Sequence, residues 1–176
     1  MFLFTFGGLW FELYALGTLG MTPVVPVAIA IATVALLVVA YRRYRQHKPA
    51  LAAEVPTPGQ TRADRVFHIV NAGQWVVIFI VASVLSHLGL SSWTIPAIIF
   101  IVGLHFLPLA HAFANPPHYA TGASLIVLAV AYPLLAPHGP TDSIGCLGAG
   151  LILWASALWA VTGNRSSRRT RLPGVV

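Results

Sequence analysis

The sequence predicts an all-α fold: a polytopic transmembrane bundle of about six helices, arranged as three hairpins, with both termini on the cytoplasmic side. The first observation is the composition, since 57% of the residues are hydrophobic, 8% are charged and the mean hydropathy is +0.81. A soluble domain carries roughly 25% charged residues. The second is a series of apolar runs near the length of about 20 residues that crosses a bilayer. The third is that all 10 Lys and Arg residues fall in two short stretches, 42–65 and 165–171.

The apolar runs predict six spans within a single transmembrane domain, residues 1–164. They lie near 2–19, 23–41, 66–88, 93–113, 118–136 and 143–162. Pro23 suits the first turn of the second span, because a backbone N–H is not needed there. The breaks after the later spans are clusters of Gly, Pro, Asn and Ser, which favour turns. The charged, proline-bearing segment 42–65 predicts a cytoplasmic linker, and 165–176 predicts a basic cytoplasmic tail.

The positions of the basic residues predict the orientation. Four predicted spans separate the linker from the tail, and an even number of spans returns the chain to the same side of the membrane. The positive-inside rule then places both segments, and by parity the N-terminus, in the cytoplasm. Arginines beside the spans are expected to meet anionic lipid headgroups; these are Arg42, Arg43, Arg45, Arg168 and Arg169.

Other classes of protein are excluded or left open by the same sequence. No nucleic-acid reader motif accompanies the net charge of +6, so no nucleic-acid partner is predicted. Cys146, the one cysteine, excludes an internal disulfide framework. No Lys or Arg precedes the first apolar run, so no removable signal peptide is expected. Assembly into a homo-oligomer stays open.

Glu12 is the most conspicuous polar residue of the first span. An ionised carboxylate without a partner is strongly disfavoured in an apolar environment, so a protonated or hydrogen-bonded Glu12 is expected. Two interpretations carry equal weight. Glu12 accepts a proton or binds a cation, or it makes a structural hydrogen bond between helices.

Polar residues of the third and fourth spans predict a cavity open to the cytoplasm. The fourth span runs opposite to the third, so His105 falls level with Gln74, and His111 level with His68. Pro108 leaves the carbonyl of Leu104 without its helical donor beside His105. The cavity candidates are Glu12, placed toward the inner end, with His68, Asn71, Gln74, His105, His111, His118 and Tyr119. Pro96, Gly103 and Pro108 are assigned structural roles.

No catalytic or metal motif emerges from the spacing of these residues. His105 and His111 are six residues apart, which turns them to different helix faces, unlike the four-residue spacing of a zinc helix. Axial haem ligation by a histidine pair stays open, with His68 and His111 as the inner pair and His87 and His138 as the outer pair. His105 is expected to be the sensitive histidine, because it lies near the bilayer middle. No cofactor is identified, and an enzyme is not favoured.

Three functions therefore remain. The protein binds or passes a small solute, ion or proton through the polar cavity; it is a haem- or metal-binding redox protein; or it is a structural, partner-binding membrane protein. Under the last interpretation the buried polar side chains serve as interhelical hydrogen bonds, worth roughly 0.6 to 2 kcal/mol each.

One segment carries a resemblance, and it reads WTIPAIIFIVGLHFLPLAHAF followed by PPHYATGA. It resembles a family of small, uncharacterised bacterial multi-span inner-membrane proteins. The similarity rests on Trp93, Ile95, Pro96, Gly103, His105, Phe106, Pro108, His118, Tyr119 and Gly122. The resemblance implies a location in the bacterial inner membrane and supplies no activity and no catalytic residues.

Overall fold

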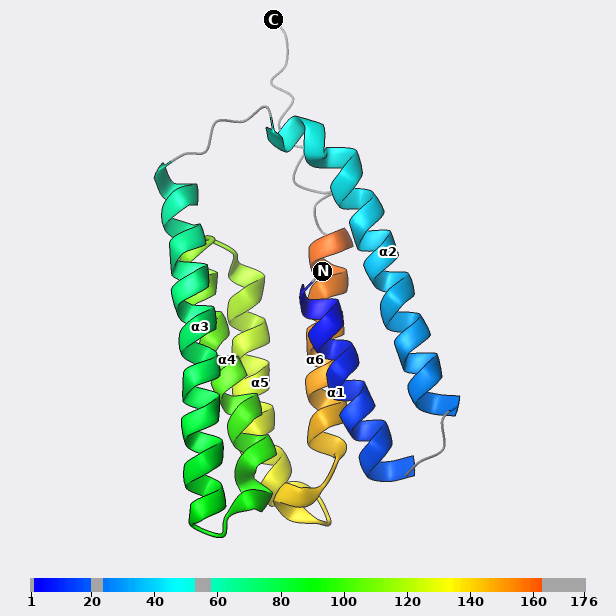
Figure 1. The fold of residues 1–176 in the computed structure, drawn as a ribbon, viewed down its shortest axis with the longest axis vertical. Helices are drawn as coiled ribbons and strands as arrows, with labels where there is room; N and C mark the ends of the chain where they lie inside the picture. The colour runs from blue at the N-terminus through cyan, green and yellow to red at the C-terminus, as the bar shows by residue number, and fades with distance from the viewer. Residues whose placement is uncertain (1, 20–23, 53–57, 163–176) are drawn as a thin grey trace, which may run out of the picture.

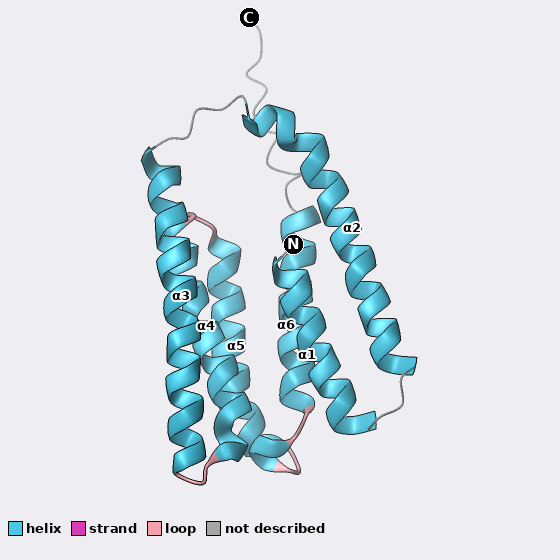
Figure 2. Cartoon of the chain, viewed as in Figure 1, coloured by secondary structure: helices cyan, strands magenta, loops and turns pink. Residues whose placement is uncertain are grey.

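The chain folds into a bundle of α-helices in a computed structural model that describes residues 2–19, 24–52 and 58–162. The helices are α1 (Phe2–Leu19), α2 (Val24–Ala52), α3 (Pro58–His87), α4 (Thr94–Ala112), α5 (Pro116–Leu135) and α6 (Ile144–Thr162), with single 3-10 turns η1 (Ser91–Trp93) and η2 (Gly139–Thr141) (Figure 1). Within the described ranges the chain forms no strand, and short loops join the helices (Figure 2). The predicted all-α bundle is confirmed.

Five of the described helices are long and apolar enough to cross a membrane, judged by length and composition. Their apolar segments are Val24–Gln46, Thr61–His87, Ser91–Ala112, Pro116–Leu135 and Ile144–Val161. The first helix, α1, forms where the first span was predicted. On α2 and α3, none of the apolar window is buried inside the bundle, so most of their side chains face outward, as expected of helices that border lipid.

The helices α2 and α3 extend well beyond the predicted spans. α2 continues to Ala52, past the predicted end at 41, and α3 begins at Pro58, before the predicted start at 66. The expected linker 42–65 is therefore helical at both ends, and only 53–57 lies outside the described residues. Arg, Gln, Leu and Ala are good helix formers, so the end of the apolar run does not end the helix. The predicted tail 165–176, with Arg168 and Arg169, also lies outside the described residues.

Successive helices run in opposite directions, which gives the bundle two distinct ends (Figure 1). One end contains the C-terminal part of α2, the start of α3, the α4–α5 turn and the end of α6. We call it the basic end, because it carries Arg42, Arg43, Arg45, Arg62 and Arg65. The guanidinium of Arg43 donates a 2.8 Å hydrogen bond to the carbonyl oxygen of Val161 in the last turn of α6. The two regions that flank the basic stretches thus share one side, as the parity argument requires.

The bundle consists of two halves, α3–α4–α5 and α6–α1–α2, which meet mainly where α5 packs against α6. Within one half, α4 and α5 approach backbone to backbone: a Cβ atom added at Gly103 would lie 3.0 Å from the carbonyl oxygen of Gly122, and one added at Gly122 would lie 2.8 Å from that of Gly103. In the other half, the indole N–H of Trp154 on α6 donates to the carbonyl of Phe4 on α1 at 3.1 Å. Small residues that allow such close approach are typical of membrane helix pairs.

The core lies where the two halves meet. Its buried members come from α1, α4, α5 and α6: Trp10, Ile99, Phe106, Leu125, Ala129, Tyr132, Cys146, Ala149 and Leu153. This apolar cluster closes the middle of the bundle.

Candidate functional site

A cavity of about 460 Å³ lies between the two halves of the bundle. Residues from α1, α3, α4, the α4–α5 turn, α5 and α6 line it: Leu3, Phe6, Trp10, Phe67, Gln74, Val102, His105, Phe106, Leu109, Phe113, Ala114, Asn115, His118 and Leu153. Trp10, Phe106 and Leu153 also belong to the core cluster, so they form the floor of the cavity. Phe113 and Ala114 are exposed at the α4–α5 turn, which places the rim at the basic end (Figure 1).

His105 is the most informative side chain of the lining. Its side chain is only 8% exposed, and its Nδ1 atom is buried without a hydrogen-bond partner among the described residues. The backbone carbonyl of Val70 on α3 lies near the ring. Because Nδ1 is unpartnered, we assign the ring proton to Nε2, the nitrogen that can donate toward this carbonyl. In the neutral imidazole, Nδ1 is then a bare acceptor. Buried polar atoms are nearly always satisfied, so this unpartnered atom, in a residue that lines the cavity, is a candidate hydrogen-bond partner for a ligand group or a water molecule.

Asn115 and His118 form a second polar group at the rim. The amide nitrogen of Asn115 lies 3.2 Å from Nε2 of His118. The amide N–H donates, so Nε2 of His118 accepts and the ring proton resides on Nδ1. This contact exists because α5 starts with Pro116 and Pro117, which fix the first turn and leave Asn115 just before it. Asn115 makes no capping bond to the helix backbone, so its side chain is available to His118.

Five aromatic side chains also line the cavity: Phe6, Trp10, Phe67, Phe106 and Phe113. The Phe106 ring contacts both imidazoles, with centroid distances of 5.8 Å to His105 and 5.7 Å to His118. Phe67 on α3 meets Phe113 at the end of α4 with centroids 6.4 Å apart. No Asp, Glu, Lys or Arg is among the residues that line the cavity. The lining thus offers apolar surface and a few neutral polar groups, and it has no fixed charge to pair with an ion.

The structure brings together three of the predicted cavity residues and separates the others. Gln74, His105 and His118 line the cavity. His68, His111 and Tyr119 are exposed, and Asn71 is half-buried outside the lining. The expectation that His68 and Asn71 share an interior pocket with His105 is therefore corrected. About 100° of rotation per residue turns His68 roughly 120° away from Gln74, six residues later.

Glu12 does not belong to this cavity, contrary to the prediction. It lines a separate hollow of about 350 Å³ between α1 and α2, together with Thr5, Phe6, Gly8, Leu9, Ala30, Thr33 and Val34. The side chains of α1 that reach the cavity are Leu3, Phe6 and Trp10. Because Glu12 follows Trp10 by two residues, it points about 160° away from it around the helix.

The three residues assigned structural roles occupy different environments. Pro96 and Gly103 are buried in α4, and Gly103 forms the close contact with α5. Pro108 lies inside α4 without ending it. Pro108 and Leu104 are both exposed and outside the lining, so the carbonyl that Pro108 leaves without a donor does not contribute to the cavity wall.

The residues that the sequence did not single out are the aromatic ones. Phe67 and Gln74 are seven residues apart, which is close to two full turns, so they share a face of α3. On α4, Val102, His105, Phe106, Leu109 and Phe113 follow the helical spacing of one face. Taking the residues at helical spacing from Gln74 on α3 and from His105 on α4 would have identified these other lining residues from the sequence.

The described ranges contain no group of three or more His, Cys, Asp or Glu side chains that could hold a metal ion. The inner histidine pair considered for haem, His68 and His111, is exposed and outside the cavity, and the outer pair, His87 and His138, is also exposed.

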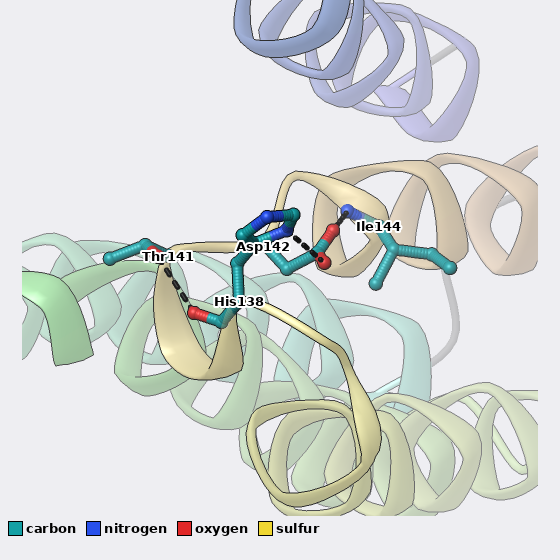
Figure 3. A network of polar contacts seen from close by, with 4 residues as sticks. All are labelled: His138, Thr141, Asp142 and Ile144. Carbon is teal, nitrogen blue, oxygen red and sulfur yellow. Dashed lines mark hydrogen bonds and ion pairs between the residues drawn. The ribbon is translucent and has the colours of Figure 1, made fainter.

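His138 and Asp142 form a local turn network at the end opposite the basic end (Figure 3). Nδ1 of His138 lies 3.3 Å from one carboxylate oxygen of Asp142, whose other oxygen accepts a 3.0 Å hydrogen bond from the backbone N–H of Ile144. The Ile144 N–H, with a smaller contribution from His138, holds the pKa of the Asp142 carboxyl below its usual value, against a weaker opposing effect of burial. Because the folded-state pKa is lowered, ionised Asp142 stabilises the fold above its unfolded pKa, and this is lost as the pH falls through the folded-state pKa.

Comparison with known proteins returned no relative: no protein-family model, no curated protein sequence and no solved structure matches the chain.

Proposed function

We propose that the protein is a multi-pass protein of the bacterial inner membrane that binds a small neutral amphiphile in the cavity, reached from the cytoplasmic basic end. The observation that carries the proposal is that His105, a residue of the cavity wall, has a buried Nδ1 atom without a hydrogen-bond partner among the described residues. Since this atom is an acceptor in the neutral ring, the ligand must bring a hydroxyl or N–H donor to it. The inner-membrane location rests on the resemblance described above and on the positive-inside rule.

The chemistry of the wall supports a neutral ligand over an ion or a proton. The cavity volume of about 460 Å³ falls in the range of small-molecule sites, and such sites combine an apolar lining with a few placed polar groups. An ion would leave its hydration shell without gaining a charged partner, which is unfavourable. Glu12, the one carboxylate considered for proton transfer, lines a different hollow. The core cluster also closes the floor, which favours a binding site over a through-passage.

The redox alternative has weaker support. The histidines expected to hold a haem from opposite sides, His68 and His111, are exposed and outside the cavity. His105 and His118 do line one cavity. The ring of Phe106 contacts both imidazoles, however, so it takes up space beside them that a haem held by the two rings would need.

Photolabelling tests the proposal with a defined probe. An octanol that carries a diazirine on the third carbon from the hydroxyl is irradiated with the protein in liposomes, and labelled residues are mapped by mass spectrometry. We expect label on the lining residues of α1, α3 and α4, saturable by excess plain octanol. Val102→Phe fills the cavity and should abolish this label, whereas Val84→Phe, the same change on the exposed face of α3, should leave it intact.

Two results would overturn the proposal. One is label confined to exposed residues such as Phe79 and Ile80, which are accessible from the bilayer. The other is cavity label that does not saturate and survives Val102→Phe, since this would show partitioning into the protein surface without a site.

A further inference from the structure

A second hollow adjoins the cavity across the Asn115–His118 pair. It is a groove of about 240 Å³ between α5 and α6, lined by Asn115, Pro117, His118, Ala120, Thr121, Ser124, Ile152, Ala155, Ser156, Trp159 and Ala160. Asn115 and His118 line the cavity as well. The two hollows therefore share one wall.

The groove has a different chemistry from the cavity. The hydroxyl groups of Thr121, Ser124 and Ser156 line the groove, whereas no hydroxyl side chain is among the residues that line the cavity. Thr121 is only 3% exposed, so its hydroxyl is a buried polar group of the kind found in binding sites rather than at a lipid surface. No charged side chain is among the lining residues, so the groove also suits a neutral group.

The hydroxyls of Thr121 and Ser156 have more acceptors in reach than hydrogens to give. Thr121 Oγ1 lies 3.1 Å from the Pro117 carbonyl oxygen and 2.7 Å from Ser156 Oγ, which in turn lies 2.8 Å from the Ile152 carbonyl oxygen. Each hydroxyl carries one hydrogen, so only two of these three contacts are hydrogen bonds at one time. The 2.7 Å contact requires a hydrogen between the two oxygens, so one hydroxyl donates to the other, and the accepting hydroxyl donates to its own helix carbonyl. The donating oxygen then keeps both lone pairs, and the accepting oxygen keeps one, for a hydrogen bond from a ligand.

We infer that the cavity and the groove form one bipartite site, which takes a neutral molecule with two hydrogen-bond donors separated by an apolar body. One donor meets Nδ1 of His105 in the cavity, and the second meets the hydroxyl oxygens of Thr121 and Ser156 in the groove. The apolar body passes the Asn115–His118 pair and lies against the aromatic wall. This inference rests on the proposed function and adds the second subsite and the class of ligand.

The test compares two probes that differ in one hydroxyl. The first is the octanol described above; the second is the octanediol with a hydroxyl at each end and the diazirine on the same carbon. In liposomes we expect the octanol to label the cavity, and the diol to label the cavity and also the groove residues of α5 and α6. The double variant Thr121→Val with Ser156→Ala should lower the groove label by roughly two- to tenfold, as expected for one or two neutral hydrogen bonds.

Matched variants separate binding from folding. Ser83→Ala removes an exposed hydroxyl that bonds only to its own helix, and it should leave all labelling unchanged. Ser156→Ala alone removes one of the two hydroxyl oxygens and leaves Thr121 Oγ1 within reach of the Pro117 carbonyl, and it should also weaken the groove label. This single variant provides the test if the double variant does not fold.

The outcomes distinguish this inference from the proposed function. If the diol labels only the cavity, as the octanol does, the bipartite site is refuted while the proposed function stands. If groove label is retained in Ser156→Ala and in the double variant where it folds, the hydroxyls do not hold the second donor and the inference is again refuted. If neither probe labels the cavity, the proposed function fails, and the inference fails with it.

Discussion

Replacing His105 with leucine should make the ligand-free protein slightly more stable while it removes the binding site. The side chain is 8% exposed and carries a buried nitrogen without a partner. Removing such an orphaned group gains about 1 to 3 kcal/mol, whereas the lost hydrogen bond to the backbone of Val70 costs about 0.5 to 1.5 kcal/mol. Leucine has a similar volume, so the packing change is small. The expected net effect is a gain of about 1 kcal/mol.

Thermal unfolding in detergent measures this difference. A change of about 1 kcal/mol shifts the midpoint of a protein of this size by roughly 2 to 4 °C. The His105→Leu variant should therefore unfold at a temperature a few degrees above wild type, and photolabelling of its cavity by the octanol probe should fall. His87→Ala is the matched control, because His87 is exposed at the end of α3, and it should change neither quantity.

An ordinary core histidine would behave in the opposite way. If His105→Leu lowered the stability by about 2 kcal/mol or more, the imidazole would be a structural element with its polar atoms satisfied. If the variant were more stable but bound the probe as wild type does, the unpartnered nitrogen would be a tolerated defect in packing and no part of a site.

Three further predictions concern packing, pH and orientation. Gly103→Ala should destabilise the bundle by about 1 to 3 kcal/mol, because the added Cβ meets the backbone of α5. In the control Gly73→Ala the added Cβ has no atom within 4 Å, so this variant should be neutral or stabilising by up to about 1 kcal/mol. Equal effects of the two variants on the free energy of unfolding would contradict the close contact. The stability of the wild type should fall as the pH drops below the ordinary pKa of Asp142 and through its lowered folded-state pKa. The fall should be steeper than in Asp142→Asn. Parallel curves of stability against pH in acid would refute the stabilising role of ionised Asp142. Reporter fusions at Thr57 and after Arg171 should both report the cytoplasm, and an external signal at either would overturn the orientation.

The fold could be predicted from the sequence because membrane insertion depends on the length of apolar runs, which can be read along the chain. The length of an apolar run fixes whether a helix can span, so the six helices form close to where they were predicted. The position of a helix end that lies outside the apolar run does not follow from hydropathy. The hydropathy signal stops near residue 41, yet α2 continues to Ala52. Arg, Gln, Leu and Ala in this segment favour a helix, and Pro49, an unfavourable residue inside a helix, does not end it.

The candidate site was predicted only in part, because the sequence gives the depth of a residue and not the direction in which its helix faces. His105, Gln74 and His118 were found by depth, and they do line one cavity. His68 was found by the same criterion, but it is exposed. In a soluble helix the polar face would have indicated the direction. A membrane helix has apolar residues on both its lipid face and its packed face, so that signal is weak.

Within one helix, however, relative direction does follow from the sequence, and Glu12 shows how this could be used. Trp10 is buried in the core cluster, so the face of α1 that points into the bundle is the one that carries Leu3, Phe6 and Trp10 at helical spacing. A residue two positions beyond Trp10 must then point away from the cavity. Once one buried aromatic anchors the rotation of a helix, the carboxylate is excluded from the site by geometry alone. The ligand proposed for the cavity would therefore be recognised by neutral hydrogen-bonding groups, which is the basis for expecting a donor-bearing, uncharged molecule.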